Sequence, residues 1–527
     1  MKTNTPSDIK LSHLFDDSSI KKQLQYSFLF SFLFLFIAHS ARFFNLAYTN
    51  DSLQIYQATD AYWQIHLGRW GQVLYCKLRG TIVVPYVIGL LCGLYISCAA
   101  FLITRMFNIQ KKIYIAILCM FMTCNEALNS LNATFINSSD IIMFSMLLSV
   151  ISVFFWNRWR FGFLLSAPLL TLSLSLYQAD LQTAILLILL ILFVNLLSTR
   201  DVKKTFVFKG LKGASYILAG ILLYMVSLPI VYKHTQVTPS THFNNVFSGN
   251  FLRTLFPRII KTWAQPFEFI LNPHALHPRL TSILFIVLIS WTVILAFMYI
   301  FRVHKSHISK VILLLILLLL PFATNFSFFL SEITRERMTY AYSIIAVLPI
   351  VLTSKIIDSH SFRNSLIIHS IFLALSGLLF FNNLVYGNEY YIRRELEFDS
   401  TLSLMTRVVD RIEQTPGYTR DTNVVFIGTL YDSPLAMTRS GFEHIGERDD
   451  SNTTNVYAPS APEKYYWYFW QILGYPLNLA DEFTHQRLSA KKEVRTMPVF
   501  PEEGCIQFVD DILVVKLGYV YIPPEFL

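Results

Sequence analysis

Long apolar stretches alternate along this chain with short polar connections, and about eleven such stretches are present. They cover residues 24–44, 84–107, 113–128, 139–156, 161–177, 181–197, 211–232, 280–301, 309–329, 339–356 and 364–386. Most approach the length of about twenty apolar residues that a helix needs to cross the hydrocarbon core of a bilayer. The pattern therefore predicts a mainly α protein, a polytopic helical bundle within a membrane.

The basic residues between these stretches predict the orientation of the bundle. Lys and Arg gather in every second connection, around residues 105–112, 158–160, 200–209, 302–310 and 355–363, whereas the turns at 129–138 and 178–180 carry none. Cytoplasmic loops of membrane proteins carry the excess of Lys and Arg. We therefore expect the N-terminus in the cytoplasm and everything after about residue 387 on the outer side.

The polar segments divide the chain into three predicted parts: a cytoplasmic segment 1–23, a transmembrane bundle 24–386, and an outer domain 387–527. Two long outer loops, 45–83 and 233–279, interrupt the bundle. Aromatic and apolar residues recur at helical spacing in the first loop, which is typical of helices that lie at the bilayer surface. In the outer domain, a helical pattern at 395–414 and strand patterns at 423–427 and 505–517 predict a small α/β fold.

Composition excludes several classes of protein. Hydrophobic residues make up 54% of the chain and charged residues 15%, which is unlike a soluble protein. The net charge of +9 is mostly accounted for by the cytoplasmic connections, so no nucleic-acid partner is expected. The chain has no P-loop, no Gly-rich dinucleotide motif and no D-x-D sequence. We therefore expect no nucleotide or other cofactor, and the requirement for a divalent metal stays open.

The first candidate catalytic group is an acidic pair on the first outer loop. Asp51 directly follows the first apolar stretch, and Asp60 lies about two helical turns further on. A carboxylate at the outer mouth of a bundle can act as a general base on an acceptor hydroxyl. The alternative is that Asp51 caps a helix of the loop, a common role of Asp.

A second candidate is the outer turn 331–337, which carries two Glu and two Arg within seven residues. The planar guanidinium groups of Arg335 and Arg337 suit a phosphate group, as does that of Arg69 in the first outer loop. Glu332 and Glu336 are candidates for contacts with a sugar. The alternative for this turn is an internal cluster of Glu–Arg ion pairs.

A third candidate is the polar break between the stretches 161–177 and 181–197. Gln178 and Asp180 lie in this break, on the predicted outer side, where they could bind sugar hydroxyl groups. A simple capped turn is an equally good interpretation.

Three segments, taken in order, resemble one known family. They are Tyr48-Thr-Asn-Asp51 after the first apolar stretch, Leu67-Gly-Arg-Trp70 in the first outer loop, and Leu174-Ser-Leu-Tyr-Gln-Ala-Asp180. Together with the topology, they are similar to the GtrII-like serotype-converting enzymes, which are multi-pass glucosyltransferases that modify O-antigen. Where similar proteins tend to have Asp-Asp after the first span, this chain has Asn50-Asp51, so Asp60 is kept as the second candidate base.

The resemblance implies a GT-C-like architecture in the bacterial inner membrane, with the active site facing the periplasm. The implied donor is a polyprenyl-phosphate-linked sugar, most simply undecaprenyl phosphate glucose, which a separate synthase makes and a flippase delivers. The implied acceptor is an envelope polysaccharide, the O-antigen of lipopolysaccharide. In the expected reaction, Asp51 deprotonates the acceptor hydroxyl, and Arg335, Arg337 and Arg69 stabilise the departing lipid phosphate in an inverting single displacement.

Two other classes of function share much of this pattern. A transporter or flippase for lipid-linked sugars would also have outer-face cations within a polytopic bundle, but such proteins tend to show internal repeats, and this sequence shows none. A polysaccharide polymerase or ligase would share both the topology and the lipid-linked donor. Only the family likeness separates it from a glucosyltransferase.

Overall fold

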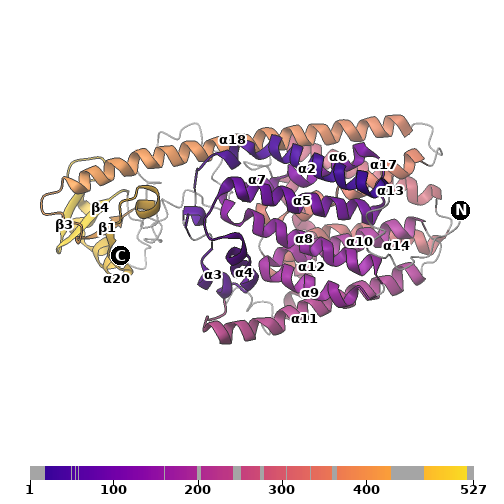
Figure 1. Ribbon diagram of the computed structural model, residues 1–527, viewed down its shortest axis with the longest axis horizontal. Helices are drawn as coiled ribbons and strands as arrows, with labels where there is room; N and C mark the ends of the chain where they lie inside the picture. Colours follow the sequence, from indigo (N-terminus) through magenta and orange to yellow (C-terminus); the bar gives the residue numbers. More distant parts are fainter. Residues whose placement is uncertain are drawn as a thin grey trace. The chain divides into compact units, whose positions relative to one another are not determined.

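The computed structural model describes residues 18–48, 50–53, 55–56, 59–159, 161–198, 203–240, 251–272, 278–303, 306–332, 334–358, 365–428 and 468–518 (Figure 1). These residues fall into two compact units. The first unit consists of residues 1–44, 59–132 and 136–388, and the second consists of residues 45–58, 133–135 and 389–527.

The first unit is helical. It contains α2 (Ser18–Phe44), α3 (Ala61–His66), α4 (Trp70–Arg79), α5 (Pro85–Phe107), α6 (Lys112–Thr123), α7 (Glu126–Thr134), α8 (Ile136–Arg158), α9 (Phe163–Leu176), α10 (Leu181–Ser198), α11 (Lys209–Thr235), α12 (Phe251–Leu271), α13 (Arg279–Val303), α14 (His307–Thr324), α15 (Phe326–Ser331), α16 (Ala341–Ile344), α17 (Val347–Asp358) and the first half of α18 (Ser365–Glu413). Short turns η2 (Gln178–Asp180), η3 (Lys203–Phe208) and η5 (Glu336–Met338) lie between them.

Eight of the described helices are long and apolar enough to cross a membrane. The bent pair α6–α7 adds a ninth candidate, and the shorter apolar helices are Phe163–Leu176 and Ala341–Ile357. Each apolar stretch found in the sequence falls on one of these elements, which confirms a mainly α membrane protein. The number of eleven crossings and their orientation stay predictions.

Helix α10 lies at the centre of this bundle. It contacts α8, α9 and α11 from the first half of the unit and α14, α15, α16 and α17 from the second half. Most of its residues are buried, which explains why its sequence is apolar on all sides rather than on one stripe. The turn η2, which directly precedes α10, is thereby fixed next to helices from both halves.

Small residues allow close contact between the first helices. A Cβ atom on Gly93 of α5 would lie only 2.7 Å from the Phe32 ring of α2, and one on Gly89 would lie 2.6 Å from the Phe43 ring. Membrane helices associate by this kind of packing, since lipid provides no hydrophobic drive between them.

The second unit contains a small sheet. Its strands are β1 (Asn423–Ile427), β2 (Asn478–Leu479), β3 (Ile506–Val509) and β4 (Ile512–Lys516), in the order β2-β1-β4-β3. Strand β1 pairs in parallel with β2 and β4, and β3 pairs antiparallel with β4. The unit also contains the short helical turns η1 (Asn50–Leu53) and η9 (Tyr468–Ile472), the end of α18, α20 (Glu482–Ala490) and α21 (Lys492–Thr496).

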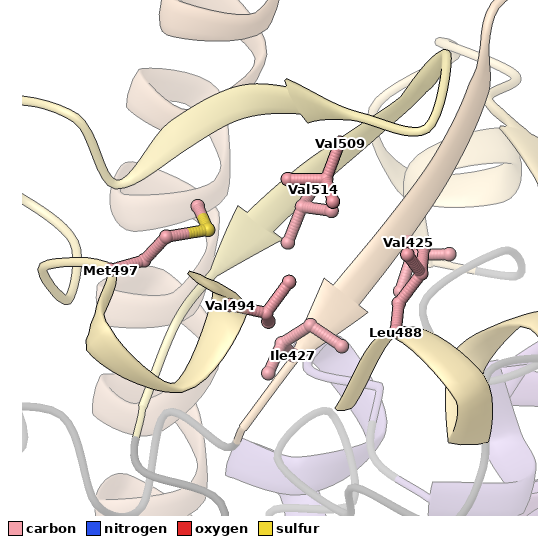
Figure 2. Packing of buried hydrophobic residues seen from close by; sticks show 7 residues of the cluster. All are labelled: Val425, Ile427, Leu488, Val494, Met497, Val509 and Val514. Carbon is pink, nitrogen blue, oxygen red and sulfur yellow. The ribbon is translucent and has the colours of Figure 1, made fainter. Parts of the chain in front are cut away.

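Apolar side chains between the sheet and the short helices form the core of this second unit (Figure 2). Val425 and Ile427 come from β1, Val509 and Val514 from β3 and β4, and Leu488, Val494 and Met497 from the segment around α20 and α21. The strands predicted at 423–427 and within 505–517 are thus confirmed. The turn between the latter two consists of Asp510 and Asp511, both at positive φ, a conformation that Asp tolerates better than most residues.

Candidate active site

The first outer loop folds into two short helices. Asp60 caps α3, with its carboxylate accepting a hydrogen bond of 3.1 Å from the backbone N–H of Trp63. The chain then turns at Gly68, which has a φ of +77° that favours glycine, and α4 begins at Trp70. The loop is therefore helical, as its spacing predicts. Asp60 is an exposed helix cap, a role that leaves one of its oxygens without a described partner.

Arg69 lies between these helices and points to the break between α9 and α10. Its Nε donates to Oε1 of Gln178 at 3.1 Å, and its guanidinium lies over the ring of Tyr177, 5.3 Å from the centroid. Gln178 in turn donates from Nε2 to the carbonyl of Leu67 at 2.8 Å and to the hydroxyl of Tyr224 at 3.0 Å. Arg69 and Gln178, two residues chosen from the sequence, are therefore in direct contact.

The outer turn 331–337 also contacts Tyr177, through Arg337. The buried phenol of Tyr177 interacts with the guanidinium of Arg337 as well as with that of Arg69. The turn η5 that carries Arg337 is fixed by Gln182 of α10, whose amide donates to the carbonyl of Met338 and accepts from the hydroxyl of Ser327 at 2.9 Å. Two cations from distant parts of the chain thus converge on one aromatic ring beside the Gln178 amide.

The other residues of the turn 331–337 serve different purposes. Glu332 forms an ion pair of 2.9 Å with Arg258 of α12, whose side chain is almost fully buried, whereas half of the Glu332 side chain is exposed. Glu336 is buried, and its carbonyl accepts a hydrogen bond of 2.7 Å from the Thr339 hydroxyl. Arg335 is partly buried and has interactions of its own. The ion pair of Glu332 is therefore made with another helix and not within the turn.

Asp180 is buried, whereas a residue that binds a sugar at the outer surface would be exposed. It is buried at the start of α10, its Oδ1 accepts a long hydrogen bond of 3.5 Å from Thr183, and its carbonyl accepts one of 2.9 Å from Ser149. These contacts resemble those of a capped turn, the alternative that the sequence left open. Any role of Asp180 in binding a sugar stays a prediction.

Asp51 belongs to the second unit, in the turn η1. Its side chain lies outside the described residues, so its predicted meeting with the turn 331–337 stays a prediction. The backbone of this segment packs on η9, where the Tyr56 N–H donates to Oε1 of Gln471 at 3.3 Å.

The sequence of this chain matches one known protein family. The model of the family described as glucosyl transferase GtrII matches residues 40–353, more than half of the chain. The chain belongs to the GtrII glucosyltransferase family. Comparisons with curated proteins and with solved structures find no match. The region shared with the GtrII family contains the candidate residues from Asp51 to Arg337, and it ends before α18 and the sheet of the second unit.

Sequence reasoning missed one buried charge cluster within the GtrII region. Nη1 of Arg79, at the end of α4, forms an ion pair of 2.7 Å with Asp140 of α8, and both side chains are nearly inaccessible. The Tyr75 hydroxyl donates to Asp140 at 2.8 Å and also contacts Tyr95 at 3.0 Å. Burial, together with the negative charge of Asp140, raises the pKa of the Tyr75 phenol. These contacts attach α4, the helix that follows Arg69, to α8 of the bundle.

A signal for this cluster is present in the sequence. Asp140 begins a long apolar stretch, and ionisable groups at membrane depth are costly unless they are paired. The sequence does not indicate the partner, because Arg69, Lys77 and Arg79 of the outer loop are equally available by topology.

Proposed function

We propose that this GtrII-family glycosyltransferase moves a glucosyl residue from a polyprenyl phosphate donor to an envelope polysaccharide on the outer face of the bacterial inner membrane. The observation that supports this proposal most is the convergence of Arg69 and Arg337 beside Gln178. Two guanidinium groups held at one place can bind and neutralise a phosphate. A donor that carries its own phosphate and membrane anchor needs no nucleotide-binding motif, and the sequence contains none.

In the proposed reaction, the oxygen of an acceptor hydroxyl attacks the anomeric carbon of the donor sugar. The bond between that carbon and the phosphate oxygen breaks, and its electron pair leaves with the lipid phosphate. The proton of the hydroxyl passes to Asp51, or to Asp60 if that carboxylate is the base. Arg337, Arg335 and Arg69 stabilise the negative charge on the leaving phosphate, an electrostatic contribution that is often the largest in catalysis. One displacement inverts the anomeric centre.

The test is a transfer assay with the purified full-length protein in proteoliposomes, synthetic polyprenyl phosphate glucose and O-antigen acceptor. We expect wild-type protein to transfer glucose and Asp51→Asn to lose roughly two to four orders of magnitude in rate. Arg337→Gln should lose about two to three orders of magnitude through weaker stabilisation of the leaving group. Arg420→Gln, which alters an exposed arginine of the second unit, is the matched control and should keep its rate.

Asp60→Asn separates the two candidate bases. Asn caps helices about as well as Asp, so this variant should keep both its fold and its rate. A large loss in Asp60→Asn with normal activity in Asp51→Asn would move the base to Asp60. Absence of transfer by wild-type protein with every donor and acceptor would favour a transporter, a polymerase or a ligase instead.

A further inference from the structure

The helices of the first unit surround a partly open cavity of about 630 Å³. Its walls come from α12, α13, α14 and α17, with contributions from α6, α7 and α18. The volume lies within the range of about 300–1,000 Å³ that is usual for pockets that bind small molecules. Nothing in the proposed reaction has so far used this space.

The lining of the cavity changes from apolar to polar along α14. On α14 the lining residues run from Val311 to Thr324, a span of thirteen residue steps that corresponds to about 20 Å of helix. Leu, Ile and Phe side chains dominate this length. Most polar lining residues gather where α14 ends and α7 begins, namely Asn125, Glu126, Thr324, Thr339, Tyr342, Ser343 and Asn383, whereas Thr292 lies in the middle of α13. The alternation of basic connections predicts that this polar end is the outer end of the helices.

The polar end adjoins the basic turn. Thr339 lines the cavity and follows Arg337 by two residues, and its hydroxyl donates to the carbonyl of Glu336 at 2.7 Å. The wall on this side is formed by α12, which is fixed to α14 by a hydrogen bond of 2.8 Å from Trp263 Nε1 to the carbonyl of Leu318. Arg258 of the same helix forms the ion pair with Glu332. The cavity thus has a long apolar body and a polar end, which includes Glu126 and adjoins the turn that carries Arg337.

We infer that this cavity holds the head-proximal isoprene units of the donor's polyprenyl chain, with the phosphate at the Glu336–Thr339 turn. The ligand that fits such a space is an amphiphile with a single apolar chain and an anionic head. The inference rests on the donor chemistry of the proposed function, and it adds where the chain of that donor lies.

Photolabelling of the full-length protein in nanodiscs tests this inference without any need for transfer. The probe is polyprenyl phosphate with a diazirine in its first isoprene units, and labelled peptides are mapped by mass spectrometry. We expect adducts on the lining faces of α13 and α14 and competition by unlabelled polyprenyl phosphate. Equal competition by phosphatidylglycerol would assign the cavity to ordinary phospholipid, and adducts confined to other helices would also overturn the inference.

A matched pair of variants on α13 provides a second test of the inference. Val293 lines the cavity and Ile294 does not, while both are similarly exposed at 41% and 51%. Val293→Trp should reduce labelling roughly tenfold by displacing apolar carbons of the chain, whereas Ile294→Trp should leave it unchanged. Leu317→Trp, from the α14 wall, repeats the test in case Val293→Trp does not fold. Normal labelling in both lining variants would overturn the inference.

Loss of transfer and loss of labelling are independent results. Labelling in the cavity without transfer by wild-type protein would reject the proposed glucosyltransferase reaction and keep the binding site. Transfer without labelling in the cavity would keep the reaction and reject this site.

Discussion

At the scale of single residues, the buried ion pair between Arg79 and Asp140 connects α4 to α8. Both side chains are nearly inaccessible, so removal of one charge leaves the other buried without compensation. We expect Asp140→Asn to lower the free energy of unfolding by about 3–5 kcal/mol, as for other broken buried pairs. Thermal unfolding of the detergent-solubilised protein measures this loss.

The double variant Arg79→Met/Asp140→Leu is the control for this prediction. It removes both charges, so it should recover much of the stability that Asp140→Asn loses. A double variant that is as unstable as the sum of its single variants would contradict a direct interaction between the two side chains.

The sequence indicates which residues are polar or charged but not which of them contact each other. The residue types at Arg69, Gln178 and Arg337 indicate polar chemistry at the outer face, and the structure brings these three together around Tyr177. Asp140 was visible as a charge at the edge of an apolar stretch, but its partner depends on how α4 packs against α8. Apolar periodicity gives the face of a helix and not the depth or rotation of its neighbour, so pairs of this kind cannot be read from one sequence.

At the scale of elements, the turn between α3 and α4 depends on Gly68. Its φ is +77°, and a Cβ atom there would lie 2.6 Å from the hydroxyl of Tyr224. Gly68→Ala therefore introduces both backbone strain and a clash, at a cost of about 1–2 kcal/mol for the strain alone. Since Arg69 is the next residue, we expect this variant to lose transfer activity as well as stability, measured by the proteoliposome assay and by thermal unfolding.

Tyr224→Phe in the Gly68→Ala background separates the two causes. It removes the clashing oxygen but leaves the unfavourable φ, so partial recovery of stability is expected. Activity equal to that of wild type in Gly68→Ala alone would show that the position of Arg69 does not depend on this turn.

The turn between β3 and β4 gives the second unit a dependence on pH. Hydrogen bonds from Lys491 and from Arg487 lower the pKa of Asp510. A carboxyl group whose folded pKa is depressed contributes stability above its unfolded pKa of about 3.9 and loses it as pH falls through the folded value. Asp510→Asn should therefore lower the melting temperature slightly at pH 7, with the difference from wild type shrinking as pH falls below the unfolded pKa and disappearing below the folded pKa.

This substitution is suited to the position, because Asn also tolerates the positive φ of Asp510. Arg487→Gln removes one of the two donors and should show the same trend with a smaller amplitude. A melting-temperature difference that is constant over the whole pH range would mean that backbone strain, and not charge, causes the effect.

Element boundaries show a further limit of the sequence. The apolar stretch 364–386 and the helical pattern 395–414 predict two helices separated by a change of composition near residue 388. The structure joins them into one helix, α18, of 49 residues. No Pro or Gly lies between Asn388 and Glu395, so nothing in the backbone ends the helix there. A change from apolar to polar composition marks a change of environment and not of secondary structure.

At the scale of the whole molecule, the orientation in the membrane decides whether the proposed chemistry is possible. The arginines proposed to bind the lipid phosphate must lie on the same side as the acceptor. The alternation of basic connections predicts that this is the outer side. The chain offers a clean background for a labelling test, because five of its six cysteines are buried and Cys98 is partly buried. New cysteines can therefore be placed at one exposed position on each predicted side.

Gln110, in the connection between α5 and α6, and Glu502, in the second unit, are both exposed. In spheroplasts treated with a membrane-impermeant maleimide, Glu502→Cys should label at once, whereas Gln110→Cys should label only after permeabilisation. The physical reason is that Arg105, Lys111 and Lys112 hold the first connection in the cytoplasm. The reverse pattern would place the turn 331–337 in the cytoplasm, where no O-antigen acceptor is available, and it would thereby remove the basis for an outer-face transferase even if the arginine cluster binds phosphate.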